Sequence, residues 1–178
     1  MKKVEHGKTF DRNAANPPAF EIFHNTVTEG YPEHWHTAIE IIMPTRGEYE
    51  VVVGKDSYNL KEGDIIMINS GVVHGMRFVS QGERIVMLVE PGCVENQEEM
   101  ETIFLRLPAI YFKKEDEEDP FYLFLRSQIL ELVREYDNEG AVMTHRICTG
   151  LKELFSEFGR KGFSEANAQN TFGAMKQQ

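Results

Sequence analysis

Glycine-containing turns divide residues 18–92 into short apolar segments, and this pattern constrains the fold more than any other feature of the chain. Turns of this kind occur at Gly47, Gly54, Gly63 and Gly71. The segments between them are rich in β-branched residues, which favour strands. Six to eight short strands at spacings of roughly ten residues predict a small antiparallel β-barrel or sandwich.

The strand segments can be placed from their composition and alternation. In residues 48–53, Tyr49, Val51 and Val53 alternate with other residues, so they are expected to face inward. Residues 65–68 are all apolar, which predicts burial on both faces or a position in a barrel wall. The expected strands cover residues 20–27, 36–43, 48–53, 65–68, 74–79 and 84–89.

The hydrophobic period changes after residue 92. Between residues 94 and 114 the pattern is mixed, and we expect one short helix that Pro108 ends. The acidic run 115–119 is expected to be a solvated loop, and it places negative charge at the positive end of the helix that follows.

Two amphipathic helices are expected next. Apolar residues recur every three or four positions from Phe121 to Tyr136, which predicts a helix of about five turns. Asp119 is a suitable N-cap, and Pro120 suits the first helical position. A second helix is expected over residues 143–158. The two helices form an antiparallel hairpin that covers the barrel, pairs with a second copy of the chain, or does both.

The chain of 178 residues therefore divides into four parts. Residues 1–17 form a polar arm, which is either a frayed terminus or a cover for the pocket. Residues 18–92 form the β-barrel, and residues 93–162 form the helical segment. Residues 163–178 are polar and are expected to be a linker or a disordered tail.

Composition excludes several classes of function. The formal net charge of −10 leaves no basic face for a nucleic-acid backbone. There is no run of about 18 apolar residues and no signal peptide, so we expect a cytoplasmic protein without a membrane partner. Cys93 and Cys148 are expected to be reduced thiols. No nucleophile elbow, phosphate-binding loop or dinucleotide-binding glycine motif occurs, so no catalytic residue is assigned.

The candidate metal ligands include a histidine pair and a nearby glutamate. His34 and His36 are two residues apart, so on a strand both side chains face the same side, with Cα atoms about 6.6 Å apart. Glu40 has the same parity, but a straight strand would carry it about 13 Å beyond His36. Metal binding therefore requires a bend near Thr37 and Ala38.

His74 would join this group from a neighbouring wall of the barrel. Three neutral imidazoles and one carboxylate suit zinc, iron, manganese, nickel or copper. Two alternatives remain: hydrogen-bonded core histidines, or a polar pocket floor that binds an organic effector without an ion. We expect Tyr49, Val51 and Met76 to contribute to ligand binding. Trp35 has the opposite parity to the histidine pair, so it is expected to pack outside or under the helices and not to line the pocket.

These residues resemble the first cupin motif, which has the form G-x5-H-x-H-x3,4-E-x6-G. His34, His36, Glu40 and Gly47 match it, and the leading Gly30 is two residues nearer than the pattern expects.

The second cupin motif has the form G-x5-P-x-G-x2-H-x3-N, and the chain resembles it in part. Gly63, Gly71 and His74 match, whereas Asn69 replaces the proline and Phe78 replaces the final asparagine. The resemblance implies a jelly-roll barrel and a metal held by four residues: His34, His36, Glu40 and His74.

A broader resemblance covers nearly the whole chain. The polar arm, the sequence His-Trp-His-Thr-Ala-Ile-Glu-Ile-Ile and the trailing helices resemble the N-terminal half of AraC-type transcriptional regulators. The resemblance implies a small-molecule effector such as a sugar, and a homodimer that forms through the C-terminal helices. It also implies that DNA is bound only by a C-terminal domain, which this sequence lacks.

Two functional hypotheses follow. The first is a small-molecule-sensing and dimerisation domain of an AraC-type regulator, which is not an enzyme. The alternative is a metal-dependent cupin enzyme, an isomerase or oxygenase that acts on a small polar substrate.

Overall fold

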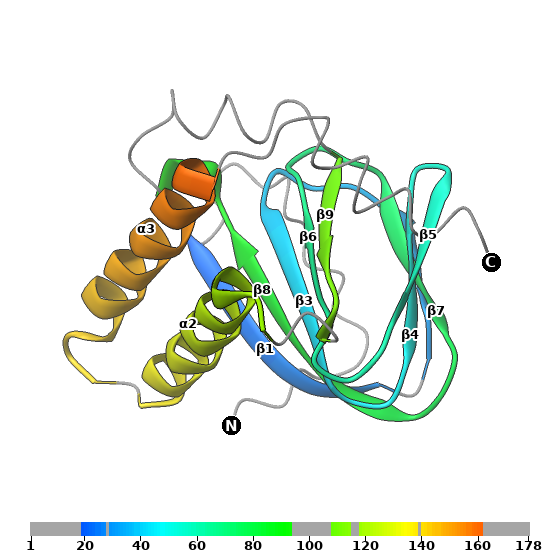
Figure 1. Cartoon of the computed structure of the whole chain (residues 1–178), viewed down its shortest axis with the longest axis horizontal. Coiled ribbons are helices and arrows are strands. Elements are labelled where there is room, and N and C mark those ends of the chain that lie inside the picture. The colour runs from blue at the N-terminus through cyan, green and yellow to red at the C-terminus, as the bar shows by residue number, and fades with distance from the viewer. Residues whose placement is uncertain (1–18, 28, 94–107, 115–117, 139, 162–178) are drawn as a thin grey trace.

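The computed structural model describes residues 19–27, 29–93, 108–114, 118–138 and 140–161. Within these residues, two antiparallel sheets are followed by two α-helices (Figure 1). The strands are β1 (Phe20–Val27), β2 (Tyr31–His34), β3 (Ile39–Arg46), β4 (Tyr49–Val53), β5 (Asp56–Leu60), β6 (Ile65–Ile68), β7 (His74–Phe78), β8 (Gly82–Val89) and β9 (Ala109–Phe112). The helices are the 3-10 helix η1 (Pro91–Cys93), α2 (Pro120–Asp137) and α3 (Met143–Lys161).

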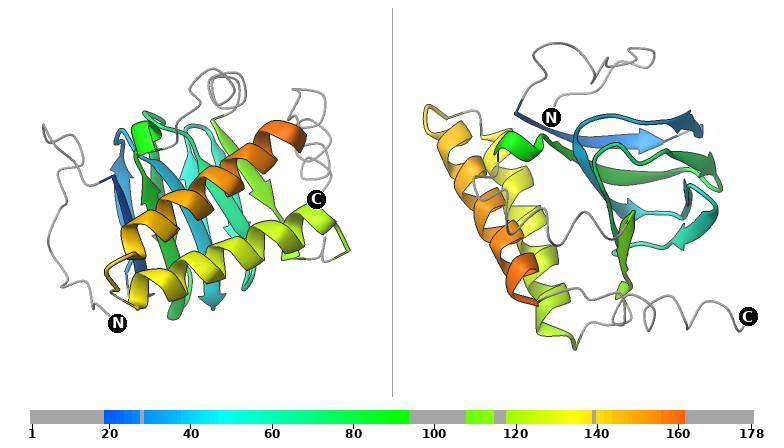
Figure 2. Two further views of the ribbon diagram at one scale, coloured as in Figure 1. Left: turned by 90° about the vertical axis from the view of Figure 1, so that its left-hand side faces the viewer. Right: turned by 90° about the horizontal axis from the view of Figure 1, so that it is seen from above.

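The two sheets face each other as a β-sandwich, which confirms the predicted mainly β class. The five-stranded sheet has the order β1-β8-β3-β6-β9, and the four-stranded sheet has the order β2-β7-β4-β5. Figure 2 shows α2 and α3 lying side by side across the outer face of the five-stranded sheet. The structure thus has three layers: helices, the five-stranded sheet and the four-stranded sheet.

Alternation along the five-stranded sheet separates two cores. On β3, Ile39 and Ile41 contact the helices, whereas Ile42 packs between the two sheets. β6 behaves in the same way, with Ile65 and Met67 toward the helices and its other two residues toward the four-stranded sheet. All four residues of β6 are buried because the helices cover the outer face, which confirms the expectation for residues 65–68.

The helices begin and pack as their sequence predicts. The Asp119 carboxylate accepts a hydrogen bond from the backbone N–H of Phe121 (2.9 Å), and Pro120 is the first helical residue. On α3, Phe158 is fully buried and its ring contacts those of Phe112 and Phe121. The hairpin therefore contributes to the hydrophobic core. Separately, no described helix is long and apolar enough to span a membrane.

The strand β9 is a difference from the sequence analysis, which assigned residues 93–162 to helices. It pairs with β6 and completes the five-stranded sheet, with Ala109 opposite Ile68 and Phe112 opposite Ile65. Four apolar residues are too few to reveal a strand period, and the partner strand lies about forty residues earlier. The short helix expected within 94–114 falls mostly on residues 94–107, outside the described residues, as do the arm 1–17 and the tail 163–178.

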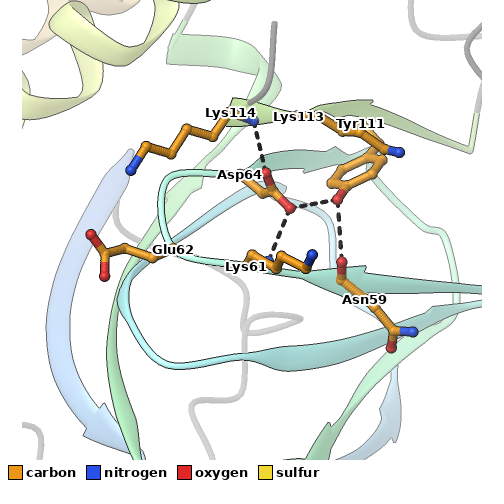
Figure 3. Close-up of a pocket in the computed structure, with 7 residues that line it drawn as sticks. All are labelled: Asn59, Lys61, Glu62, Asp64, Tyr111, Lys113 and Lys114. Atoms are coloured by element: carbon orange, nitrogen blue, oxygen red, sulfur yellow. Dashed lines mark hydrogen bonds between the residues drawn. The ribbon is translucent and has the colours of Figure 1, made fainter. Parts of the chain in front are cut away.

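The turn before β6 holds β9 in place. The Asp64 carboxylate accepts hydrogen bonds from the backbone N–H of Lys61 (2.9 Å), the Tyr111 hydroxyl (2.6 Å) and the backbone N–H of Lys114 (2.8 Å) (Figure 3). The same region borders a cavity of about 400 Å³, which none of the predicted site residues lines. The cavity is lined by Asn59, Lys61, Glu62, Asp64, Tyr111, Lys113 and Lys114.

Candidate metal centre

The structure brings together the four predicted metal ligands. Their possible ligand atoms all lie within 4.8 Å of one another. Three of the side chains are buried and His34 is half-buried, so the cluster has one side nearer the solvent. The cluster consists of His34, His36, Glu40 and His74.

A change of sheet positions the first three ligands. β2 ends at His34 in the four-stranded sheet, and the chain bends at Thr37 and Ala38 before it enters the five-stranded sheet. This bend brings the Glu40 carboxylate to 3.0 Å from Nε2 of His36, which confirms that a bend is needed. His36 lies after the end of β2, so the bend and not strand alternation orients its ring.

His74 begins β7 and faces the same region from the four-stranded sheet. It pairs directly with His34 on β2, and their ring centroids are 4.4 Å apart. The next residue is Gly75, where a Cβ atom would lie 3.0 Å from the backbone nitrogen of Glu33. The glycine therefore permits the close approach of β2 to β7 that places the two imidazoles together.

Backbone carbonyls orient all three imidazoles. A carbonyl oxygen can only accept, so each Nδ1 must carry the hydrogen and each Nε2 is left as the atom that faces the cluster. The Nδ1 atoms donate to carbonyls two residues away: His34 to Pro32 (3.0 Å), His36 to Ala38 (2.9 Å) and His74 to Val72 (2.8 Å).

The cluster contains more acceptors than neutral imidazoles can satisfy. One oxygen of Glu40, Oε2, lies 3.0 Å from Nε2 of His36 and 2.9 Å from Nε2 of His74. Both rings thus face acceptors at both nitrogens, so the network needs extra protons or another cation. Two adjacent buried imidazoliums are costly, whereas one divalent cation supplies the same charge. The residues therefore fit a metal ion.

The electrostatics of the cluster agree with this requirement for positive charge. Burial opposes ionisation of Glu40, but hydrogen bonds from His36 and His74 outweigh it and hold the pKa of Glu40 well below its usual range. Burial also acts to lower the pKa of His74, yet the Glu40 carboxylate raises it overall. For His34, burial and the neighbouring His74 lower the pKa. Glu40 is the anionic centre of the site.

The other predicted pocket residues continue inward from the cluster along β4 and β7. Val51 and Met76 pair across these strands and belong to the core between the sheets. Tyr49 is buried two residues further along β4. Their role in ligand binding remains a prediction. Trp35 is 54% exposed and lies outside the core, which agrees with the expectation that it does not line the pocket.

The sequence analysis did not include Arg84, which is a buried cation inside the sandwich. Its guanidinium lies 5.7 Å from the centre of the Tyr49 ring and contacts the sulfur of Met76. Burial lowers the pKa of Arg84, and the charge of Glu40 opposes that effect. The alternation of Arg84, Val86 and Leu88 along β8 is the signal that could have placed this side chain inside.

Comparisons with known proteins agree with the fold described above. Residues 25–90 match the sequence profile of the cupin domain. Together with the two antiparallel sheets, this match indicates a cupin-type β-sandwich over that part of the chain. No curated protein matches the sequence.

The chain resembles many solved structures, which include the following three. ToxT K231A from Vibrio cholerae has a TM-score of 0.52 at 10% identity, over 82% of this chain and 58% of that one. The SPY1581 protein from Streptococcus pyogenes has a TM-score of 0.41 at 16% identity, over 51% and 94%. The NMB1881 protein from Neisseria meningitidis has a TM-score of 0.37 at 17% identity, over 42% and 78%. The likeness to ToxT extends beyond the cupin match and concerns the fold alone.

Proposed function

We propose that this chain is the small-molecule-sensing and dimerisation domain of an AraC-type transcription regulator, and that its barrel holds a divalent transition metal. The observation that carries the proposal is the cluster of four ligand atoms within 4.8 Å of one another inside a cupin-type barrel. DNA binding would belong to another domain, which is not part of this sequence.

The metal would be held by the Nε2 atoms of His34, His36 and His74 and by the carboxylate of Glu40. Zinc, iron, manganese, nickel and copper all accept imidazole and carboxylate ligands. When bound, such an ion offers open coordination positions to oxygen or nitrogen groups of a small molecule.

The effector would enter on the half-buried side of the cluster. His34 lies there, and its ring contacts the exposed Tyr31 at a centroid distance of 4.8 Å. We propose that a small polar molecule such as a sugar binds at this side, and that Val51 and Met76 contact it from within.

Strand β3 connects the site to the helical layer. Glu40 faces the cluster, while its neighbours Ile39 and Ile41 on β3 pack against the helical layer. An effector that shifts β3 would therefore change the position of α2 and α3, and it would favour one arrangement of a dimer that forms through these helices. Leu123 on α2 is 50% exposed and is available for such a contact.

A metal-dependent enzyme is the second candidate. The observation that favours it is the complete set of three imidazoles and one carboxylate, which leaves coordination positions for a substrate in a six-coordinate site. An isomerase or oxygenase acting on a small polar molecule would use the same four ligands.

Metal analysis of the full chain tests the proposed site. We expect one equivalent of metal per chain after reconstitution with each candidate ion, measured by elemental analysis. His36→Ala should lose the ion, whereas the matched change His145→Ala, at an exposed histidine of α3, should retain it. Failure of every ion to bind the unmodified chain would refute the metal site.

A second measurement separates sensing from catalysis. The metal-loaded chain is incubated with panels of sugars and other small polar molecules, and both binding and conversion are followed. A sensor binds a compound and returns it unchanged, whereas turnover that His36→Ala abolishes would support the enzyme instead.

A further inference from the structure

Two cysteines that are distant in sequence meet outside the metal centre. The sulfur atoms of Cys93 and Cys148 are 3.6 Å apart, although 55 positions separate the residues. Cys93 ends η1, directly after β8, and Cys148 lies on α3. Both cysteines are free and half-buried. The contact therefore joins the end of the barrel to the helical layer.

Both cysteines sit on well-anchored backbone. The N–H of Cys93 donates to the carbonyl of Glu90 (2.9 Å), and the Cys93 side chain packs against the core under the helices. Cys148 follows Ile147, which is fully buried in that core. The pair is thus held together by the fold rather than by a chance encounter of flexible side chains.

We propose that Cys93 and Cys148 form an oxidisable dithiol site that a small disulfide, such as oxidised glutathione, converts into an intramolecular disulfide. The sulfurs must approach from 3.6 Å to about 2.05 Å, a distance that rotation of two side chains and a small shift can cover. The proposal does not depend on a metal in the barrel.

Oxidation of the dithiol proceeds by two successive thiol–disulfide exchanges. The Cys148 thiolate attacks one sulfur of the small disulfide, forms a mixed disulfide and releases one thiolate. The Cys93 thiolate then attacks the sulfur of Cys148 and releases the second thiolate. The two released thiolates take up the two protons that the cysteines lose.

The environment of Cys93 disfavours its thiolate form. Burial, together with the contact to Cys148, raises the pKa of Cys93 to about 11, so only a small fraction of Cys93 is thiolate at neutral pH. The Lys152 ammonium acts against that rise. Once Cys148 is in the mixed disulfide, Cys93 is the thiol nearest to it.

The disulfide would tie α3 to the end of β8. A crosslink that closes a loop of 55 positions reduces the entropy of the unfolded chain. We expect the oxidised protein to melt roughly 5–15 °C higher than the reduced protein, and hydrogen exchange in α3 to slow near Cys148.

Redox titration of the full chain in glutathione buffers tests the proposal. Intact mass and peptide mapping should show the Cys93–Cys148 crosslink, formed in one two-electron transition and reversed by excess reduced glutathione. Cys93→Ser and Cys148→Ser should each abolish the crosslink and the rise in melting temperature, and each should remain folded by circular dichroism.

Three outcomes would overturn the proposal. The first is that only mixed disulfides with glutathione form, and the second is that only crosslinks between chains form. The third is that the crosslink forms only after the chain is denatured. If either serine variant fails to fold, the unmodified chain still tests the proposal, because peptide mapping of its oxidised form identifies the Cys93–Cys148 bond directly.

Discussion

At the scale of single residues, Glu40 organises the candidate site. One of its oxygens, Oε2, lies 3.0 Å from Nε2 of His36 and 2.9 Å from Nε2 of His74, while backbone carbonyls accept from the Nδ1 of each ring. These contacts orient Nε2 of His36 and His74 toward a common point before any ion binds. Such preorganisation is what supporting hydrogen bonds provide in metal sites.

Metal binding should therefore weaken as the pH falls. Glu40 raises the pKa of His74 above the ordinary value of 6.5, so in the metal-free protein protons compete for its Nε2 near neutral pH. A raised pKa also means that the metal-free protein loses this stabilisation as the pH rises through that pKa. The melting temperature gained on adding metal should thus be larger at about pH 8 than at about pH 6. A gain that shrinks as the pH rises would contradict this prediction.

At the scale of elements, β9 depends on a buried carboxylate rather than on its own length. Asp64 precedes β6 and accepts from both Tyr111 and the backbone that follows β9 (Figure 3). A four-residue strand at a sheet edge gains little from its own pairing, so these contacts are what secure it.

Tyr111→Phe should destabilise the protein by about 1–3 kcal/mol, because it removes the hydroxyl that donates to the buried Asp64 carboxylate. Chemical denaturation measures the change, and hydrogen exchange should show faster opening of β9. The matched change Tyr31→Phe, at an exposed tyrosine, should have almost no effect on the free energy of unfolding. Equal effects of the two changes would refute the anchoring role.

The helical layer should be as important to stability as the barrel. Phe158 is fully buried against Phe112 and Phe121, so Phe158→Ala should cost about 3–5 kcal/mol. Val142→Ala, at a residue that is 54% exposed, is the control and should change stability by less than about 0.5 kcal/mol. A small effect at Phe158 would indicate that α3 is only loosely attached.

At the scale of the whole molecule, the five-stranded sheet is shared by two cores. One face packs on the helices and the other encloses the space that contains the histidine cluster. In the proposed sensing role, a change at the cluster would act on a sheet that the helices also contact.

Native mass spectrometry of the full chain tests this arrangement. We expect a homodimer with one metal ion per chain. Leu123→Asp, which puts a charge at an exposed position of α2, should produce monomers that keep their metal. A monomer at all protein concentrations would remove the dimerisation part of the proposal and leave the metal site unaffected.

Much of this architecture could be predicted from short-range patterns. The first strand and the capped start of α2 depend on alternation, turns and capping within a few residues, and all are observed as expected. The convergence of the histidines was also predictable, because the two motif-like segments supply the residues. The position of Arg84 was missed, although its alternation with Val86 and Leu88 along β8 indicates the inward face of that strand.

By itself, the sequence determined most of the described strands, the two long helices and the residue types gathered for a site, because periodicity, capping and ligand spacing are local properties. Only the tertiary structure decided which atoms meet: the shared oxygen of Glu40, the pairing of β9 with β6, and the contact of Cys93 with Cys148. Each joins segments from different layers or strands, and the free energy that selects such contacts comes from packing of the whole chain.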